Sequence, residues 1–172
     1  MAGVRPPALR QVAEAYDAKG VVTPTDTELH YDRRENTTMT KTTCGFGTHL
    51  NLPYEEAVLR VKDALKAEGF GILTEIDVRT TMREKLGVEM EPYIILGACN
   101  PPLAHRALTE EPDIGLLLPC NVVVRADGTG SRVDVADPQA MLGIAGGEQL
   151  GMVADEAKRL LQRVVAVLSK KA

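Results

Sequence analysis

The stretch Tyr93-Ile-Ile-Leu-Gly-Ala-Cys-Asn-Pro101 leads from a predicted strand directly into a predicted helix. Residues 93–96 form a compact apolar run that is typical of a strand. Asn100 suits the N-cap of the next helix, and Pro101 suits its first position, where the missing N–H costs nothing. We expect this helix to run to about Glu110. The stretch therefore predicts a strand, a capped turn and a helix in direct succession.

The segment before this stretch contains a well-marked helix. Pro53 suits its first position, and apolar side chains then recur at spacings of four, three and four residues. Gly69 suits the position just after the last turn, and Phe70 can close back on Leu65 in a Schellman motif. The pattern predicts a helix with one buried face that ends before Gly69.

Local signals divide the rest of the chain into alternating strands and helices. Residues 81–84 have the spacing of a capping box, Asp127-Gly128 predicts a hairpin turn, and Asp137 suits an N-cap before a proline. The expected helices span residues 53–68, 81–86, 101–110, 138–145 and 148–170, and the expected strands span residues 36–43, 71–78, 93–96, 114–118, 121–125 and 131–135.

This alternation predicts an α/β (α+β) fold with a two-layer sandwich. We expect a mixed sheet of about five strands, with helices mainly on one face. The last helix carries an apolar stripe that suits packing on the sheet, formed by Leu150, Ala154, Ala157, Leu161, Val164 and Leu168. If the other face of the sheet is apolar, a homodimer is its simplest cover.

Composition fits one globular domain. The chain has 172 residues, of which 44% are apolar and 26% charged, so it is long enough to bury a core. It has two Phe, four Tyr and no Trp, and the core must therefore be mainly aliphatic. Residues 1–36 differ from the rest, and we interpret them as a partly ordered N-terminal extension. Residues 37–172 form the expected folded unit.

Charge and hydropathy narrow the functional classes. The net charge of −4 and a pI of about 5.4 argue against a nucleic-acid partner. No segment approaches the roughly 20 apolar residues that span a bilayer, which argues against a membrane protein. Residues 1–19 lack the apolar core of a secretory signal, so we expect a cytoplasmic protein. The odd count of three cysteines argues against a disulfide framework.

Three segments together resemble the DUF302 family, a group of uncharacterised bacterial and archaeal domains. They are Gly69-Phe-Gly-Ile-Leu-Thr-Glu-Ile-Asp77, the opening stretch up to Pro101, and Gly115-Leu-Leu-Leu-Pro-Cys-Asn-Val122. The resemblance covers about residues 38–168 and keeps the segments in order. It implies a two-layer α/β fold and a homodimer, and it implies no reaction chemistry. The N-terminal extension and Cys44 depart from the family pattern.

Two Cys-Asn pairs are the main candidates for a functional site. Cys99 lies just outside a predicted helix N-terminus, where the helix dipole lowers the pKa of a thiol. However, Pro101 and Pro102 remove two of the N–H groups that would cradle an anion, which favours a rigid turn over an oxyanion hole. Cys120 follows Pro119 in a similar setting. A parallel crossover would put the two thiols at opposite ends of the sheet, whereas a bend at Pro119 or a dimer axis could bring them together.

Other candidate residues surround these turns. Glu75, Glu89 and Glu91 could supply acid–base groups to a cleft lined by Cys99 and Asn100, although we expect Glu75 to face solvent. His49 and His105, with Glu89 and Glu91, are possible metal ligands, but none has the paired spacing of a known zinc motif. The cofactor and the metal therefore stay unknown.

The sequence leaves three functions open. The first is a dimeric domain that binds a small ligand or a metal near Cys99-Asn100 and Cys120-Asn121, with contributions from Glu75 and Glu91. The second is a thiol-dependent enzyme or redox protein, in which Cys99 is the catalytic nucleophile and Cys120 the resolving thiol. The third is a structural or interaction module, in which both cysteines are small buried residues that fit tight strand ends.

Overall fold

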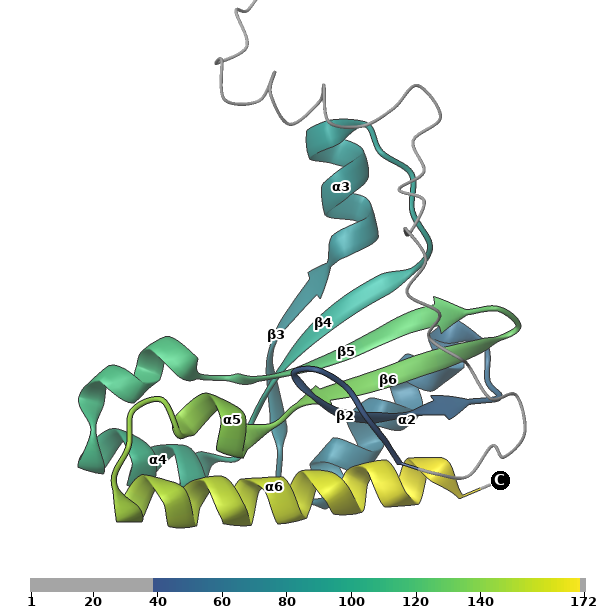
Figure 1. The fold of residues 1–172 in the computed structure, drawn as a ribbon. Helices are drawn as coiled ribbons and strands as arrows, with labels where there is room; N and C mark the ends of the chain where they lie inside the picture. The colour runs from purple at the N-terminus through teal and green to yellow at the C-terminus, as the bar shows by residue number, and fades with distance from the viewer. Residues whose placement is uncertain (1–38, 171–172) are drawn as a thin grey trace, which may run out of the picture. The chain divides into compact units, whose positions relative to one another are not determined.

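A computed structural model describes residues 39–170 of the chain (Figure 1). The extension expected over residues 1–36 lies outside the described residues. Six strands form one sheet in the order β1-β2-β6-β5-β4-β3. They are β1 (Thr40–Lys41), β2 (Gly45–Leu50), β3 (Gly71–Asp77), β4 (Tyr93–Cys99), β5 (Cys120–Asp127) and β6 (Gly130–Ala136).

The predicted two-layer α/β class is confirmed, with six strands instead of about five. All five strand pairings are antiparallel, so the sheet is not mixed. The strand that was not predicted is β2, whose glycines at positions 45 and 47 weaken the strand signal, whereas β1 is a two-residue piece of the strand predicted over residues 36–43. The connection after β4 returns the chain to the end of the sheet at which β4 finishes. β5 starts there and runs antiparallel to β4.

Helices cover one face of the sheet (Figure 1). They are α2 (Tyr54–Ala67) and α6 (Glu148–Ser169), which pack on alternate strand residues such as Leu96, Val122 and Val133. The whole predicted stripe of α6 is buried. Burial of each large aliphatic side chain contributes about 1.5–3 kcal/mol. This aliphatic layer is the main core of the domain.

Both ends of α2 illustrate how the sequence specifies the fold. The Phe70 N–H donates to the Leu65 carbonyl at 2.9 Å and the Gly69 N–H to the Lys66 carbonyl at 3.0 Å, which is the predicted Schellman motif. Gly69 has a φ of 82°, which disfavours a side chain. The start differs by one position, because Pro53 is the N-cap and not the first helical residue.

Two local predictions were wrong. Helix α3 (Val78–Leu86) begins before the predicted capping box, because the Asp77 side chain accepts a hydrogen bond from the Thr80 N–H at 2.9 Å and caps it earlier. Residues 112–117 form the short 3-10 helix η1 (Pro112–Leu117) and not a strand. Here Ile114 is buried in a second apolar cluster formed between helices, so its apolar neighbours do not mark a strand.

That second cluster forms one end of the domain (Figure 1). It joins η1, α4 (Pro101–Glu110), α5 (Pro138–Leu142) and the first half of α6. The Asp137 side chain caps α5 by accepting from the Gln139 N–H at 3.0 Å, as predicted. Together these helices cover the end of the sheet at which β4 ends and β5 begins.

The hydropathy of the helices was also compared with that of membrane spans. Among the helices of residues 39–170, none combines the length and the apolar character needed to cross a membrane.

A candidate ligand cavity at two strand ends

The antiparallel pairing of β4 and β5 brings the two Cys-Asn pairs to the same end of the sheet. Cys99 is the last residue of β4 and Cys120 is the first residue of β5. Cys120 lies opposite Ala98 in the register, next to Cys99. The opposite-end arrangement that a parallel crossover would give is therefore not adopted.

Asn100 fixes the turn between β4 and α4. Its Oδ1 accepts a hydrogen bond from the Leu103 N–H at 3.3 Å, and two prolines follow it at the start of the helix, as predicted. Its Nδ2 lies 3.1 Å from the position that a Cβ on Gly69 would take. The absence of a side chain at Gly69 thus leaves room for the Asn100 amide.

A small apolar cavity of about 30 Å³ lies beside these residues and opens to solvent on one side. By volume it holds one or two water-sized groups. No ionisable carboxylate, lysine, arginine or histidine lines it, and its polar side chains are the two thiols and the Asn100 amide. The lining residues are Phe70, Ala98, Cys99, Asn100, Leu103, Ala104, Ala107, Leu118, Cys120, Leu142, Val153 and Ala157.

Both thiols of the cavity are less acidic than ordinary cysteines. Burial raises the pKa of Cys99. Burial, with a smaller contribution from the neighbouring Cys99, raises the pKa of Cys120 to about 11. The lowering of the Cys99 pKa expected from the helix N-terminus is therefore not found. Desolvation dominates, and Pro101 and Pro102 leave few N–H groups to stabilise a thiolate.

The raised pKa of Cys120 predicts a stability change at high pH. Between its ordinary value of 9.0 and its folded value of about 11, the unfolded chain releases the thiol proton and the folded chain keeps it. Stability from this group is thus complete below pH 9 and is lost as the pH rises through 11, by about 2–3 kcal/mol. We expect denaturant unfolding of Cys120→Ala to lack this part of the pH dependence, whereas Cys44→Ala, at an exposed position, keeps it. An unchanged pH slope in Cys120→Ala would contradict the assignment.

The other predicted site residues lie away from the cavity. Asn121 is exposed and lies opposite Gly97, so it points to the other face of the sheet from Cys120. Glu91 is exposed and precedes β4, at the opposite end of that strand from Cys99. Glu75 shares the helix-covered face with Leu96, yet it is exposed at the sheet edge and forms an ion pair with Lys62 at 2.7 Å.

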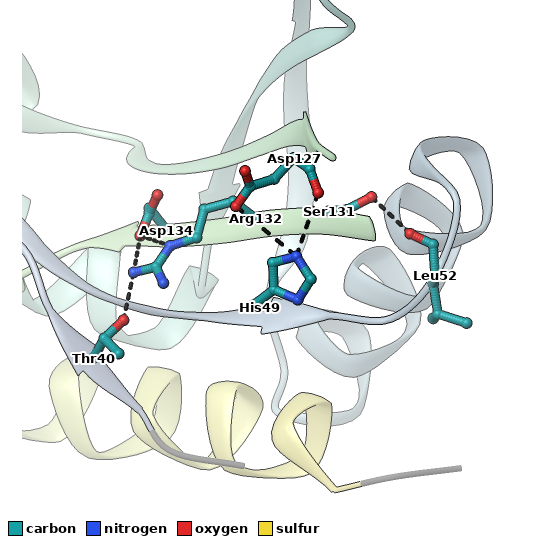
Figure 2. Close-up of polar contacts among 7 residues, drawn as sticks. All are labelled: Thr40, His49, Leu52, Asp127, Ser131, Arg132 and Asp134. Carbon is teal, nitrogen blue, oxygen red and sulfur yellow. Dashed lines mark hydrogen bonds and ion pairs between the residues drawn. The ribbon is translucent and has the colours of Figure 1, made fainter. Parts of the chain in front are cut away.

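Within residues 39–170, His49 and His105 do not belong to any cluster of potential metal ligands. Figure 2 shows His49 beside Asp127, with its Nε2 3.4 Å from the backbone oxygen and 3.9 Å from the carboxylate, in a polar group that also ties Arg132 to Asp134. His105 and Glu89 are exposed. Across residues 39–170, no three His, Cys, Asp or Glu side chains gather closely enough to hold a metal ion.

Three residues of the cavity wall come from helices far along the chain, and sequence reasoning missed them. Leu142 comes from α5, and Val153 and Ala157 come from α6, more than 40 residues after Cys99 in the chain. They are ordinary apolar residues of helical stripes, and the sequence holds no local signal that separates a cavity wall from a packed core.

Comparison with known proteins agrees with this fold. Residues 46–168 match the family model described as "Domain of unknown function DUF302". The crystal structure of an uncharacterized conserved DUF302 protein from Bacillus stearothermophilus is similar, with a TM-score of 0.67 and 27% sequence identity over 72% of this chain and 97% of that chain. No curated protein matches the sequence. Because the family model matches well over half of its length, the chain belongs to the DUF302 family.

Proposed function

We propose that this domain is a homodimer that binds a small, uncharged ligand with an apolar end in the cavity at Cys99, Asn100 and Cys120. The observation that carries the proposal is the chemistry of the lining. Apart from the two thiols and one amide, the cavity is lined by Ala, Leu, Val and Phe side chains. An apolar group that enters the cavity is removed from water and does not displace any charged side chain, so its transfer is favourable.

The lining of the cavity includes one side-chain amide, that of Asn100. The Asn100 Oδ1 is engaged by the Leu103 N–H, whereas its Nδ2 has no hydrogen-bond partner among the described residues. An amide Nδ2 carries two N–H donors. A ligand with a carbonyl or hydroxyl oxygen next to a methyl or ethyl group matches this arrangement.

The raised thiol pKa values favour this ligand over a metal or a thiolate reaction. A thiol must lose its proton to bind a metal or to act as a nucleophile, and burial disfavours the thiolate at both Cys99 and Cys120. Free cysteines also persist best in a reducing compartment, and we therefore place the protein in the cytoplasm.

Filling the cavity tests the proposal. Acetone is a suitable probe, because it is neutral and one of its methyl groups can enter the cavity while its oxygen acceptor stays at the opening. We expect NMR titration to show acetone shifting the resonances of Leu103 and Leu142 with a dissociation constant in the millimolar range, about −4 kcal/mol at most. Ala104→Leu, at a half-buried lining position, should abolish these shifts. Ala64→Leu, at a half-buried alanine of α2 outside the cavity, should leave them unchanged.

Two results would count against ligand binding. Acetone shifts that are equal in Ala104→Leu and the wild type would mean that the probe binds elsewhere. No shifts at Leu103 and Leu142 in any variant would leave the two Cys-Asn turns with a structural role only.

The interface of the proposed dimer is the face of the sheet opposite α2 and α6. Ile76, Ile95 and Val123 lie side by side in the register across β3, β4 and β5, on the face opposite the buried Val122 and Val124. Ile76 is 48% exposed, and Ile95 and Val123 are only half-buried. A row of β-branched side chains of this kind is stabilised when a second apolar surface covers it. A second copy of the same face provides a self-complementary partner.

A further inference from the structure

A second and larger cavity lies where the β1–β2 turn meets α5 and α6. Its volume is about 250 Å³, and it shares no residue with the cavity at Cys99 and Cys120. Cys44, which belongs to none of the segments that resemble the family, lies in its wall. The polar side chains of the wall include Lys41, Thr42, Thr43, Cys44, Lys158 and Gln162.

The carboxylate in this wall is already engaged. Asp137 is its one carboxylate, and Oδ1 accepts from the Gln139 N–H at 3.0 Å while Oδ2 accepts from Lys158 Nζ at 2.7 Å. Lys158 also donates to the Gln139 side-chain oxygen. An ammonium group has three N–H donors, so Lys158 keeps one for a ligand. The Asp137–Lys158 pair is therefore internally neutral but retains a donor.

The Lys41 side chain, beside the β1–β2 turn, adds a positive charge to the wall. Lys41 is exposed and has no ion-pair partner within residues 39–170. With Lys41 and Lys158 positive and Asp137 negative, the wall carries a net charge of +1. The Thr42 and Thr43 hydroxyls lie beside Lys41 and can donate as well. A ligand that matches this wall is a monoanion with several acceptor oxygens.

The remaining wall is apolar and the space is modest. Met39, Phe46 and Ala140 contribute hydrocarbon surface. A volume of about 250 Å³ corresponds to about eight waters and lies just below the usual range for small-molecule pockets. We propose that this cavity binds a small carboxylate that carries a short aliphatic chain, with the carboxylate at Lys41 and Lys158 and the chain against Met39 and Phe46.

The test uses sodium butyrate with the full-length protein. We expect butyrate to shift the amide resonances of residues 41–45 with a millimolar dissociation constant and to slow the alkylation of Cys44 by iodoacetamide, followed by mass spectrometry of the Cys44 peptide. Lys41→Glu should weaken butyrate binding by at least about tenfold, because a charge-assisted contact is replaced by repulsion. Lys41→Gln should give an intermediate loss. Lys66→Glu, at an exposed position of α2, should have no effect.

Four outcomes would overturn the proposal. Butylammonium, which has the same chain and the opposite charge, must not protect Cys44 as well as butyrate does. Inorganic phosphate that binds as tightly as butyrate would show that the apolar wall contributes nothing. Neither protection nor shifts at butyrate concentrations up to about 100 mM, or binding that is equal in Lys41→Glu and the wild type, would remove the site altogether.

Discussion

Replacing Gly47 with alanine is expected to lower the free energy of unfolding by about 3–4 kcal/mol. Gly47 lies in the middle of β2, between β1 and β6. A Cβ at this position would lie 2.1 Å from the Val133 carbonyl oxygen and 2.4 Å from Asp134 Oδ1. The first of these atoms belongs to the backbone of β6 and cannot move without breaking the pairing of the two strands. The added methyl group therefore forces β2 and β6 apart.

Urea unfolding measures this change, and Gly151 provides a control of opposite sign. Gly151 lies within α6, and a Cβ there would meet nothing within 4 Å. Gly151→Ala should raise the free energy of unfolding by about 0.5–1 kcal/mol, because alanine is the better helix former. If Gly47→Ala lost less than about 1 kcal/mol, the close approach of β2 and β6 would be wrong.

Replacing Val123 with glutamate is expected to convert the proposed dimer into a monomer. Val123 is at the centre of the row formed with Ile76 and Ile95, and its side chain faces away from α2 and α6. A carboxylate in the middle of a covered apolar surface loses its hydration without gaining a partner. The dimer dissociation constant should rise by at least about 100-fold.

Sedimentation equilibrium reads out this change as a fall from twice 18.6 kDa to 18.6 kDa. Circular dichroism should be unchanged, because Val123 is only half-buried within one chain. Leu59→Glu is the matched control, since Leu59 is 64% exposed on α2, away from the row. A wild-type chain that sediments at 18.6 kDa, or a Val123→Glu variant that stays dimeric, would contradict a dimer formed through this face.

Much of the fold could be predicted from the sequence, because its signals are local. The Schellman motif at Gly69, the Asn100 cap, the turn at Gly128 and the long apolar stripe of α6 each depend on a few neighbouring residues. The start of α3 was misplaced because two local N-cap signals lie close together there. Two caps competed there, and Asp77 accepts hydrogen bonds from both the N–H and the hydroxyl of Thr80, so the earlier cap prevails.

The candidate site could be predicted only in part, because its shape depends on contacts between distant segments. The Cys-Asn turns are visible in the sequence, but the direction of β5 decides whether they meet. That direction follows from the path of α4 and η1, and η1 was itself mistaken for a strand. The thiol pKa values likewise depend on burial by residues of α4, α5 and α6, which no local pattern reveals.

In the proposed function, the cavity at Cys99, Asn100 and Cys120 accepts a small apolar group. A crystal of the protein pressurised with xenon tests it most directly, because xenon enters dry apolar cavities without any polar contact. We expect a xenon atom between Leu103, Leu142 and Val153 in the wild type, and none there in Ala104→Leu. A wild-type cavity that stays free of xenon, or that is filled by ordered water under pressure, would contradict it.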